Sequence, residues 1–226
     1  MKIFKFVEYY LTTQVMQTVI LLAGGIFWIL TYIFIISKGY KDKTYGMPLF
    51  ALCANISWEF IFSFVLPHSP PQLYVDYLWF GLDVVIIFQF FKYHKKEFLN
   101  IQSLKLYAVF IVALASAFSI ILTGGIALGD TSGVYAAFGQ NLLMSVLFVL
   151  MFFKRERVLR GQSIFIAVFK MLGTALTSIH FYLFEPVSQS SIVLPVLFIS
   201  IFIFDLLYTL LVLNQYKKKN KSLFAT

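Results

Sequence analysis

A chain of 226 residues that is 60% hydrophobic, 19% aromatic and only 12% charged is not an ordinary soluble domain, because such domains average about 45–50% apolar and about 25% charged residues. The apolar content also excludes intrinsic disorder. The single cysteine, Cys53, excludes an intramolecular disulfide. We therefore predict one polytopic membrane domain over residues 1–226, which carries a formal net charge of +8.

The apolar stretches are long enough to be membrane-spanning helices, each of which needs about 20 residues to cross the hydrocarbon. Breaks that contain charged residues, proline or glycine separate them. The first stretch is longer than the apolar part of a signal peptide and lacks a convincing cleavage site, so we interpret it as a span. The sequence predicts an all-α bundle of seven transmembrane helices near residues 14–37, 46–66, 74–92, 104–124, 133–153, 163–184 and 192–214.

The basic residues predict the orientation of this bundle. Of the 18 lysines and arginines, all but Lys2 and Lys5 fall in the first, third and fifth connections or in the C-terminal tail. This grouping includes Lys170, whose ammonium we expect to snorkel to the cytoplasmic surface. Because basic loops stay in the cytoplasm, the N-terminus is expected outside and the C-terminus inside. Anionic lipid head groups account for the net charge, so no nucleic-acid partner is expected.

Three of the ten carboxylic acids fall within predicted spans: Glu59, Asp83 and Asp205. Each costs about 2.5–3.5 kcal/mol on membrane-insertion scales, so an acid at such a position suggests a functional site. The alternative is a hydrogen-bonded polar residue that fixes helix packing, but three acids in so small a bundle favour function. The predicted spans place all three in the outer half or the middle of the bilayer, where they could line one cavity if their helices are neighbours.

Aromatic and amide side chains lie within one helical turn of these acids. Apolar surroundings favour the neutral form of a carboxyl group, which can then donate a proton, and aromatic faces stabilise cations. Cyclisation of a polyene through carbocations requires a buried acid that donates a proton and aromatic rings that stabilise the cations. The alternative is that these aromatic residues serve packing, as aromatic residues at helical spacing usually do. The residues concerned are Asn55 and Trp58 next to Glu59, Trp79 next to Asp83, and Tyr208 next to Asp205.

Several segments in order along the chain resemble the transmembrane terpene cyclases, seven-helix enzymes of fungal meroterpenoid and indole-diterpene pathways with bacterial relatives. Their order and spacing match from about residue 44 to 210. The segments are YGM at 45–47, NISWE at 55–59, WFGLD at 79–83, QNLLMS at 140–145, Arg157, GQS at 161–163, Lys170, GT at 173–174 and Asp205.

This resemblance implies a cyclase that protonates an epoxide or a terminal alkene of a prenyl chain, an isomerase or lyase of the protonation-initiated class. It maps the two catalytic acids of the family onto Glu59 and Asp205, and Asp83 is either a further site residue or a structural one. Trp58, Trp79 and other rings would stabilise the successive cations. The expected substrate is a lipophilic prenylated molecule, with or without an epoxide, taken from a bacterial inner membrane or a fungal endoplasmic reticulum.

No cofactor or metal is expected, because the chain has no adjoining acids to hold the Mg²⁺ cluster of ionisation-type terpene synthases. The D-x-D-D acid motif of soluble protonation-type cyclases is also missing. His68 and His180 are expected to make ordinary polar contacts, and Cys53 to pack rather than react. No obligate protein partner is evident beside membrane lipid.

The main rival class is a small proton-coupled transporter, since acids within a membrane often relay protons. Pro71-Gln72 beside a span is similar to the motif of PQ-loop transporters, but no second copy of it follows. Inverted repeats and broken helices, which mark many transporter sites, are not visible either. A retinal receptor is disfavoured because residues 206–216 contain no lysine.

Overall fold

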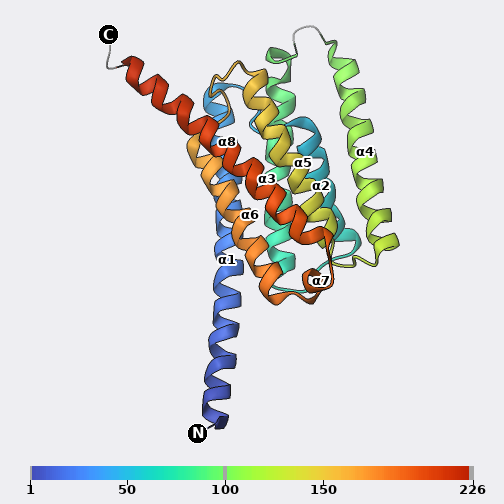
Figure 1. Ribbon diagram of the computed structural model, residues 1–226. Coiled ribbons are helices and arrows are strands. Elements are labelled where there is room, and N and C mark those ends of the chain that lie inside the picture. The colour runs from blue at the N-terminus through green and yellow to red at the C-terminus, as the bar shows by residue number, and fades with distance from the viewer. Residues whose placement is uncertain (1, 99–100, 224–226) are drawn as a thin grey trace.

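The computed structural model describes residues 2–98 and 101–223, with side chains placed for 13–95, 97–98 and 101–218. The described residues form helices and connections without a strand (Figure 1). The α-helices are α1 (Lys2–Asp42), α2 (Leu49–Phe60), α3 (Gln72–Tyr93), α4 (Ser103–Leu128), α5 (Val134–Lys154), α6 (Ile164–Phe184), α7 (Pro186–Gln189) and α8 (Val193–Leu223). A π-helical turn, η1 (Ile61–Val65), continues α2, and a 3₁₀ turn, η2 (His94–Lys96), follows α3.

The predicted all-α membrane fold is confirmed, with changes at several helix boundaries. Within the described residues, six helices are long and apolar enough to cross a membrane, and the continuous segment Leu49–Val65 is shorter. A seventh crossing by this segment therefore stays a prediction. The helix predicted from residue 14 begins at Lys2, and the one predicted to end at 214 continues to Leu223. The one-turn helix α7 was not predicted; Pro186 occupies its first turn, where the missing N–H costs nothing.

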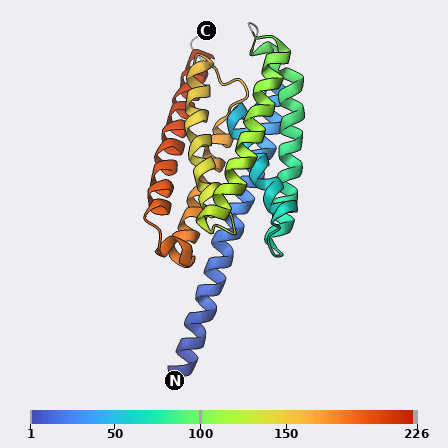
Figure 2. The same ribbon diagram turned by 90° about the vertical axis from the view of Figure 1, so that its right-hand side faces the viewer.

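Six helices form a ring, and α4 lies outside it. Going round the ring, contacts join α1 to α3, α3 to α2, α2 to α5, α5 to α8, α8 to α6, and α6 back to α1. Helix α4 packs mainly on α2 and stands apart from the rest of the bundle in Figure 1. Figure 2, viewed from the side of α4, shows it running in front of the ring.

Helix α2 is buried on nearly every side because α4 covers its outer face. Every residue from 51 to 59 is buried, including the polar Asn55 and Glu59. Small residues such as Ala51 and Ala54 let neighbouring helices approach closely. By contrast, α4 exposes large apolar side chains such as Leu104, as expected for a helix that faces lipid.

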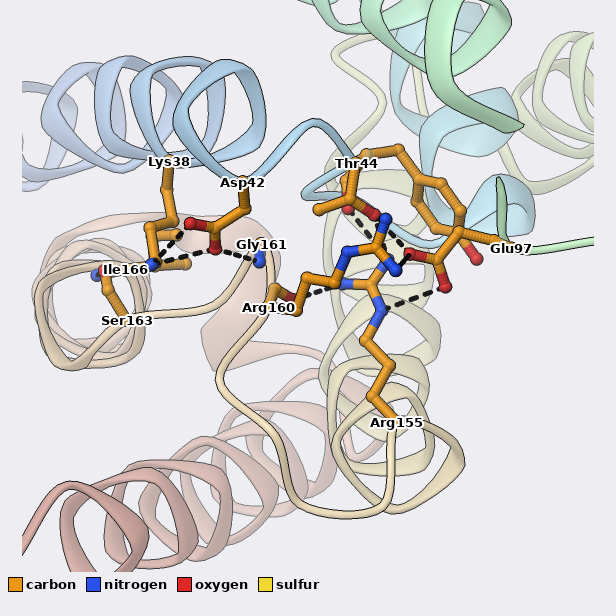
Figure 3. Close-up of polar contacts among 10 residues, drawn as sticks. Lys38, Asp42, Thr44, Glu97, Arg155, Arg160, Gly161, Ser163 and Ile166 are labelled. Atoms are coloured by element: carbon orange, nitrogen blue, oxygen red, sulfur yellow. Dashed lines mark hydrogen bonds and ion pairs between the residues drawn. The ribbon is translucent and has the colours of Figure 1, made fainter. Parts of the chain in front are cut away.

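Polar side chains tie together the connections at one end of the bundle (Figure 3). The buried guanidinium of Arg155 donates hydrogen bonds to Thr44 Oγ1 at 3.1 Å and to the carbonyls of Tyr45 at 2.9 Å and Arg160 at 2.7 Å. Its Nε also lies 3.5 Å from Glu97 Oε2, which makes an ion pair. Segments 43–48, 94–98 and 155–163 are thereby joined, and all three lie at the end where α8 finishes (Figure 1).

The grouping of basic connections at this end generates a prediction about orientation. Replacing Thr131, exposed at the opposite end, by cysteine should allow labelling by a membrane-impermeant maleimide on intact cells. A cysteine at exposed Lys95 should be labelled only after lysis, because basic connections remain cytoplasmic. The parent protein, whose Cys53 is buried, is the control. The reverse pattern of labelling would invert the proposed orientation.

The opposite end of the bundle closes around Gly133, which precedes α5 with φ at +62°. Its carbonyl accepts a hydrogen bond of 2.9 Å from the indole N–H of Trp58. A Cβ at this position would overlap the ring of Phe62 and crowd Trp58 Nε1. Glycine is therefore needed here both for its left-handed backbone and for its missing side chain.

Gly133→Ala should destabilise the protein strongly. The left-handed backbone costs about 1–2 kcal/mol for a residue with a Cβ, and overpacking adds about 1–3 kcal/mol. Thermal unfolding of the purified protein in detergent measures the effect. Gly139→Ala is the matched control, since a Cβ at that position on α5 meets nothing within 4 Å. Equal melting temperatures for the two variants would contradict the prediction.

Candidate active site

The first polar cluster inside the ring joins two of the three acids. The side-chain amide of Asn55 donates hydrogen bonds of 2.8 Å to Glu59 Oε1 and 2.8 Å to Asp83 Oδ2. The hydroxyl of Tyr32 donates a further hydrogen bond of 2.5 Å to Glu59 Oε1. All four side chains are buried. We call these residues, from α1, α2 and α3, the Glu59 cluster.

Among the described residues, the hydrogen-bond network of the Glu59 cluster contains two acids and no basic side chain. The amide nitrogen of Asn55 carries two hydrogens and faces three acceptors, which are the Tyr32 hydroxyl and one oxygen of each carboxyl group. The second oxygens, Glu59 Oε2 and Asp83 Oδ1, are buried and have no hydrogen-bond partner among the described residues. Each acid therefore keeps one oxygen that is free to bind a substrate atom or to carry a proton.

The second cluster holds the third acid and differs in its charge. Lys170 Nζ lies 2.7 Å from Asp205 Oδ1, 2.7 Å from Ser145 Oγ and 3.2 Å from Asn141 Oδ1. The side chain of Lys170 is fully buried, and that of Asp205 is 2% exposed. These residues come from α5, α6 and α8, and we call them the Asp205 cluster.

Trp28 of α1 lies between the two clusters. Its ring centroid is 6.1 Å from that of Tyr32 and 5.7 Å from Lys170 Nζ. No hydrogen bond or ion pair within the described part of the chain joins the clusters directly. Glu59 and Asp83 therefore lie together through Asn55, whereas Asp205 has its own set of partners.

The other aromatic residues singled out in the sequence lie around the clusters in different ways. Trp58 points to the end of the bundle, where its ring packs 4.9 Å from Phe62. Trp79 packs in the core, and its indole N–H has no partner in the described region. Tyr208 packs against Phe148 at 5.3 Å and donates a hydrogen bond of 3.2 Å to Gln162. Neither Trp58 nor Tyr208 makes a hydrogen bond to the acid beside it.

The sequence analysis missed two residues, Tyr32, which contacts Glu59, and Trp28, which lies between the two clusters. Tyr32 and Trp28 sit one turn apart on α1, a spacing that a search for polar and aromatic residues on one face could have found. The expectation that Lys170 snorkels to the cytoplasmic surface is wrong, because its side chain is fully buried against Asp205. An acid at depth on another helix was the available signal for this ion pair.

Asp76 lies on the same helix as Asp83, but it belongs to the end of the bundle rather than to either acid cluster. His68 in the preceding loop places Nδ1 2.7 Å from Asp76 Oδ2 and Nε2 3.2 Å from the Ser132 carbonyl. Burial lowers the pKa of His68, but the hydrogen bond and negative charge of Asp76 outweigh this effect and leave the pKa raised. The expected polar contact of His68 is confirmed and links two loops.

A groove of about 800 Å³ opens between α4 and α5. Its lining is almost wholly apolar and includes small residues such as Ala54, Ala117 and Gly139. Neither Glu59, Asp83 nor Asp205 lines it. Within the described residues, no group of three or more His, Cys, Asp or Glu side chains is arranged to hold a metal ion.

Comparison with known proteins finds a family whose sequences match this chain. The family model of the Pyr4-like transmembrane terpene cyclases matches residues 4–219. The Pyr4-family terpene cyclase mfmH of Annulohypoxylon moriforme is 38% identical over 89 residues, which is 39% of this chain and 36% of that protein. Terpene cyclase pyr4 of Aspergillus fumigatus is 33% identical over 120 residues, or 52% of this chain and 48% of that protein.

A longer match is to asnovolin H synthase nvfL of Aspergillus novofumigatus, with 29% identity over 171 residues, 72% of this chain and 68% of that protein. The chain thus aligns with less than half of the length of mfmH and of pyr4. No solved structure matches the chain. The family model nevertheless covers nearly the whole sequence and agrees with the helical membrane fold. The chain belongs to the Pyr4-like transmembrane terpene cyclases.

Proposed function

We propose that this protein is a membrane terpene cyclase that starts cyclisation by protonating an epoxide or a terminal alkene on a lipophilic prenylated substrate. One observation carries the proposal: two buried acids, Glu59 and Asp83, share the amide of Asn55 in an apolar ring of helices. Family membership supports a cyclase over the proton-coupled transporter. The names of mfmH and pyr4, both terpene cyclases, also support a cyclisation.

The Glu59 cluster supplies the proton in this proposal. Two ionised carboxylates at one amide, with no cation beside them, would repel each other in a medium that screens charge poorly. The pair therefore favours a state in which the two groups together hold one proton. Glu59 is the donor because the family resemblance assigns it a catalytic role, and Tyr32 and Asn55 fix its position.

The chemical steps balance without an added reactant. The O–H bond of the Glu59 carboxyl group breaks as the proton passes to the epoxide oxygen or to a terminal alkene carbon. The epoxide C–O bond or the alkene π bond opens to give a tertiary cation. Internal alkenes then attack in turn and form the ring bonds. Loss of a proton from the carbon beside the last cation restores an alkene, so the substrate is isomerised.

Water must be kept away from such cations, because it would trap them as alcohols. Within each cluster the polar side chains bond mainly to one another, and all of them except the half-buried Asn141 are buried. Aromatic rings next to the clusters, Trp28 and Tyr32 above all, offer faces that stabilise a passing positive charge. Trp58, Trp79 and Tyr208, each within one helical turn of an acid, would stabilise further cations.

Glu59→Gln should abolish cyclisation, since the amide cannot protonate the substrate; general acids contribute about 10²–10⁴-fold to a rate. Asp205→Asn should also reduce turnover by at least about 100-fold, because a carboxylate that stabilises developing positive charge is lost. The measurement is mass-spectrometric product analysis with the purified protein in nanodiscs and an epoxidised farnesylated aromatic compound. Glu156→Gln, at an exposed position, is the matched control.

The two acids of the Glu59 cluster should differ in their effect on the rate. Asp83→Asn leaves Glu59 able to carry the proton, so its turnover should fall less than that of Glu59→Gln. Initial rates of product formation measure the difference, with thermal unfolding to verify that both variants are folded. Normal rates for Glu59→Gln would overturn the acid assignment. Uptake of a solute into proteoliposomes without any change of a prenylated substrate would favour the transporter.

A further inference from the structure

We infer that Lys170 is a positioning residue that holds Asp205 as a carboxylate. The two catalytic acids then have different roles in the reaction. Glu59 then gives the first proton and Asp205 accepts the last one. This inference rests on the proposed function and deepens it, since the resemblance to the family treats the two acids alike.

The count of donors and acceptors at Lys170 supports an ammonium. A charged lysine has three N–H donors, and Nζ has three acceptors within reach: Asp205 Oδ1 at 2.7 Å, Ser145 Oγ at 2.7 Å and Asn141 Oδ1 at 3.2 Å. All three come from other helices, so the ammonium is held between α5 and α8. A buried charge requires such a partnered setting.

The carboxylate of Asp205 follows from the same geometry. A carboxyl group 2.7 Å from a buried ammonium is favoured in its charged form by the attraction of the opposite charge. Its second oxygen, Oδ2, is buried and has no hydrogen-bond partner in the described region. This oxygen is left to face a cation or to accept a proton. The Glu59 cluster, in contrast, has no basic partner among the residues that the structure describes.

The division of roles closes the proton balance of the reaction. The proton that leaves Glu59 becomes part of the substrate, and a different proton leaves the final cation for Asp205 Oδ2. After the reaction Glu59 is ionised and Asp205 is neutral. Return of one proton from Asp205 to Glu59 resets the enzyme. During cyclisation, Lys170 and Asp205 form a pair with no net charge, so the ammonium does not oppose the substrate cation.

The test is infrared spectroscopy of the full-length protein in nanodiscs, because protonated and ionised carboxyl groups have distinct stretching bands. Protein made with isotope-labelled aspartate separates the Asp bands from the Glu bands. Asp205→Asn should remove a carboxylate band and leave the protonated-carboxyl bands in place. Loss of a protonated-carboxyl band in this variant would overturn the inference.

Lys170→Met provides the second arm of the test. Removing the ammonium should let Asp205 take up a proton, so a new protonated aspartate band should appear, and adding Asp205→Asn should remove it. Cyclisation should fall by at least about 100-fold. Lys170→Arg, which keeps the charge, should show no new band. Lys105→Met, at an exposed position, is the matched control. No new band in folded Lys170→Met would also overturn the inference.

These spectra need no turnover, so they separate this inference from the proposed function. If the wild-type protein converts no prenylated substrate, the cyclase proposal fails while the state of Asp205 is still measured. If Lys170→Met does not fold, the difference spectrum of Asp205→Asn decides the question alone. Normal product formation by a folded Lys170→Met variant would show that the ammonium does not act through Asp205.

Discussion

The cost of a charge inside an apolar bundle is the constraint from which most of this structure follows. A polar group that loses water must find its partners within the protein. The ring of helices meets this need in two different ways. Around Glu59 and Asp83, an amide and a phenol hold acids without a cation. Around Asp205, a lysine provides the opposite charge. The chemistry that we propose depends on this difference in partners.

The fold could largely be predicted from composition, because length and apolar character alone identify spanning helices. The helix boundaries were harder to predict, because α1 and α8 continue beyond their apolar stretches into polar residues that remain helical. The order of helices around the ring could not be predicted, since it depends on packing between segments far apart in sequence. The place of α4 outside the ring, over α2, is an example of such a feature.

The candidate site was predictable in part. Asn55 and Glu59 are one turn apart on one helix, so their hydrogen bond follows from local geometry. The contact of Asn55 with Asp83 requires α2 and α3 to be neighbours, and that of Asp205 with Lys170 requires α6 and α8 to meet. The prediction that the Lys170 ammonium reaches the surface was wrong because basic residues were grouped by the nearest connection, without regard to how deep each one lies in its helix. The position of a lysine ammonium within a membrane depends on an acidic partner as much as on the distance to the nearest loop.

The position of α4 has a consequence for how such enzymes can diversify. This helix contributes no side chain to either acid cluster, yet it forms one wall of the groove beside α5. Substitutions along α4 can therefore reshape an apolar surface that faces lipid while the acids and their partners stay unchanged. Selection could act on these two parts of the molecule separately, with chemistry preserved in the ring and variation concentrated on the helix outside it.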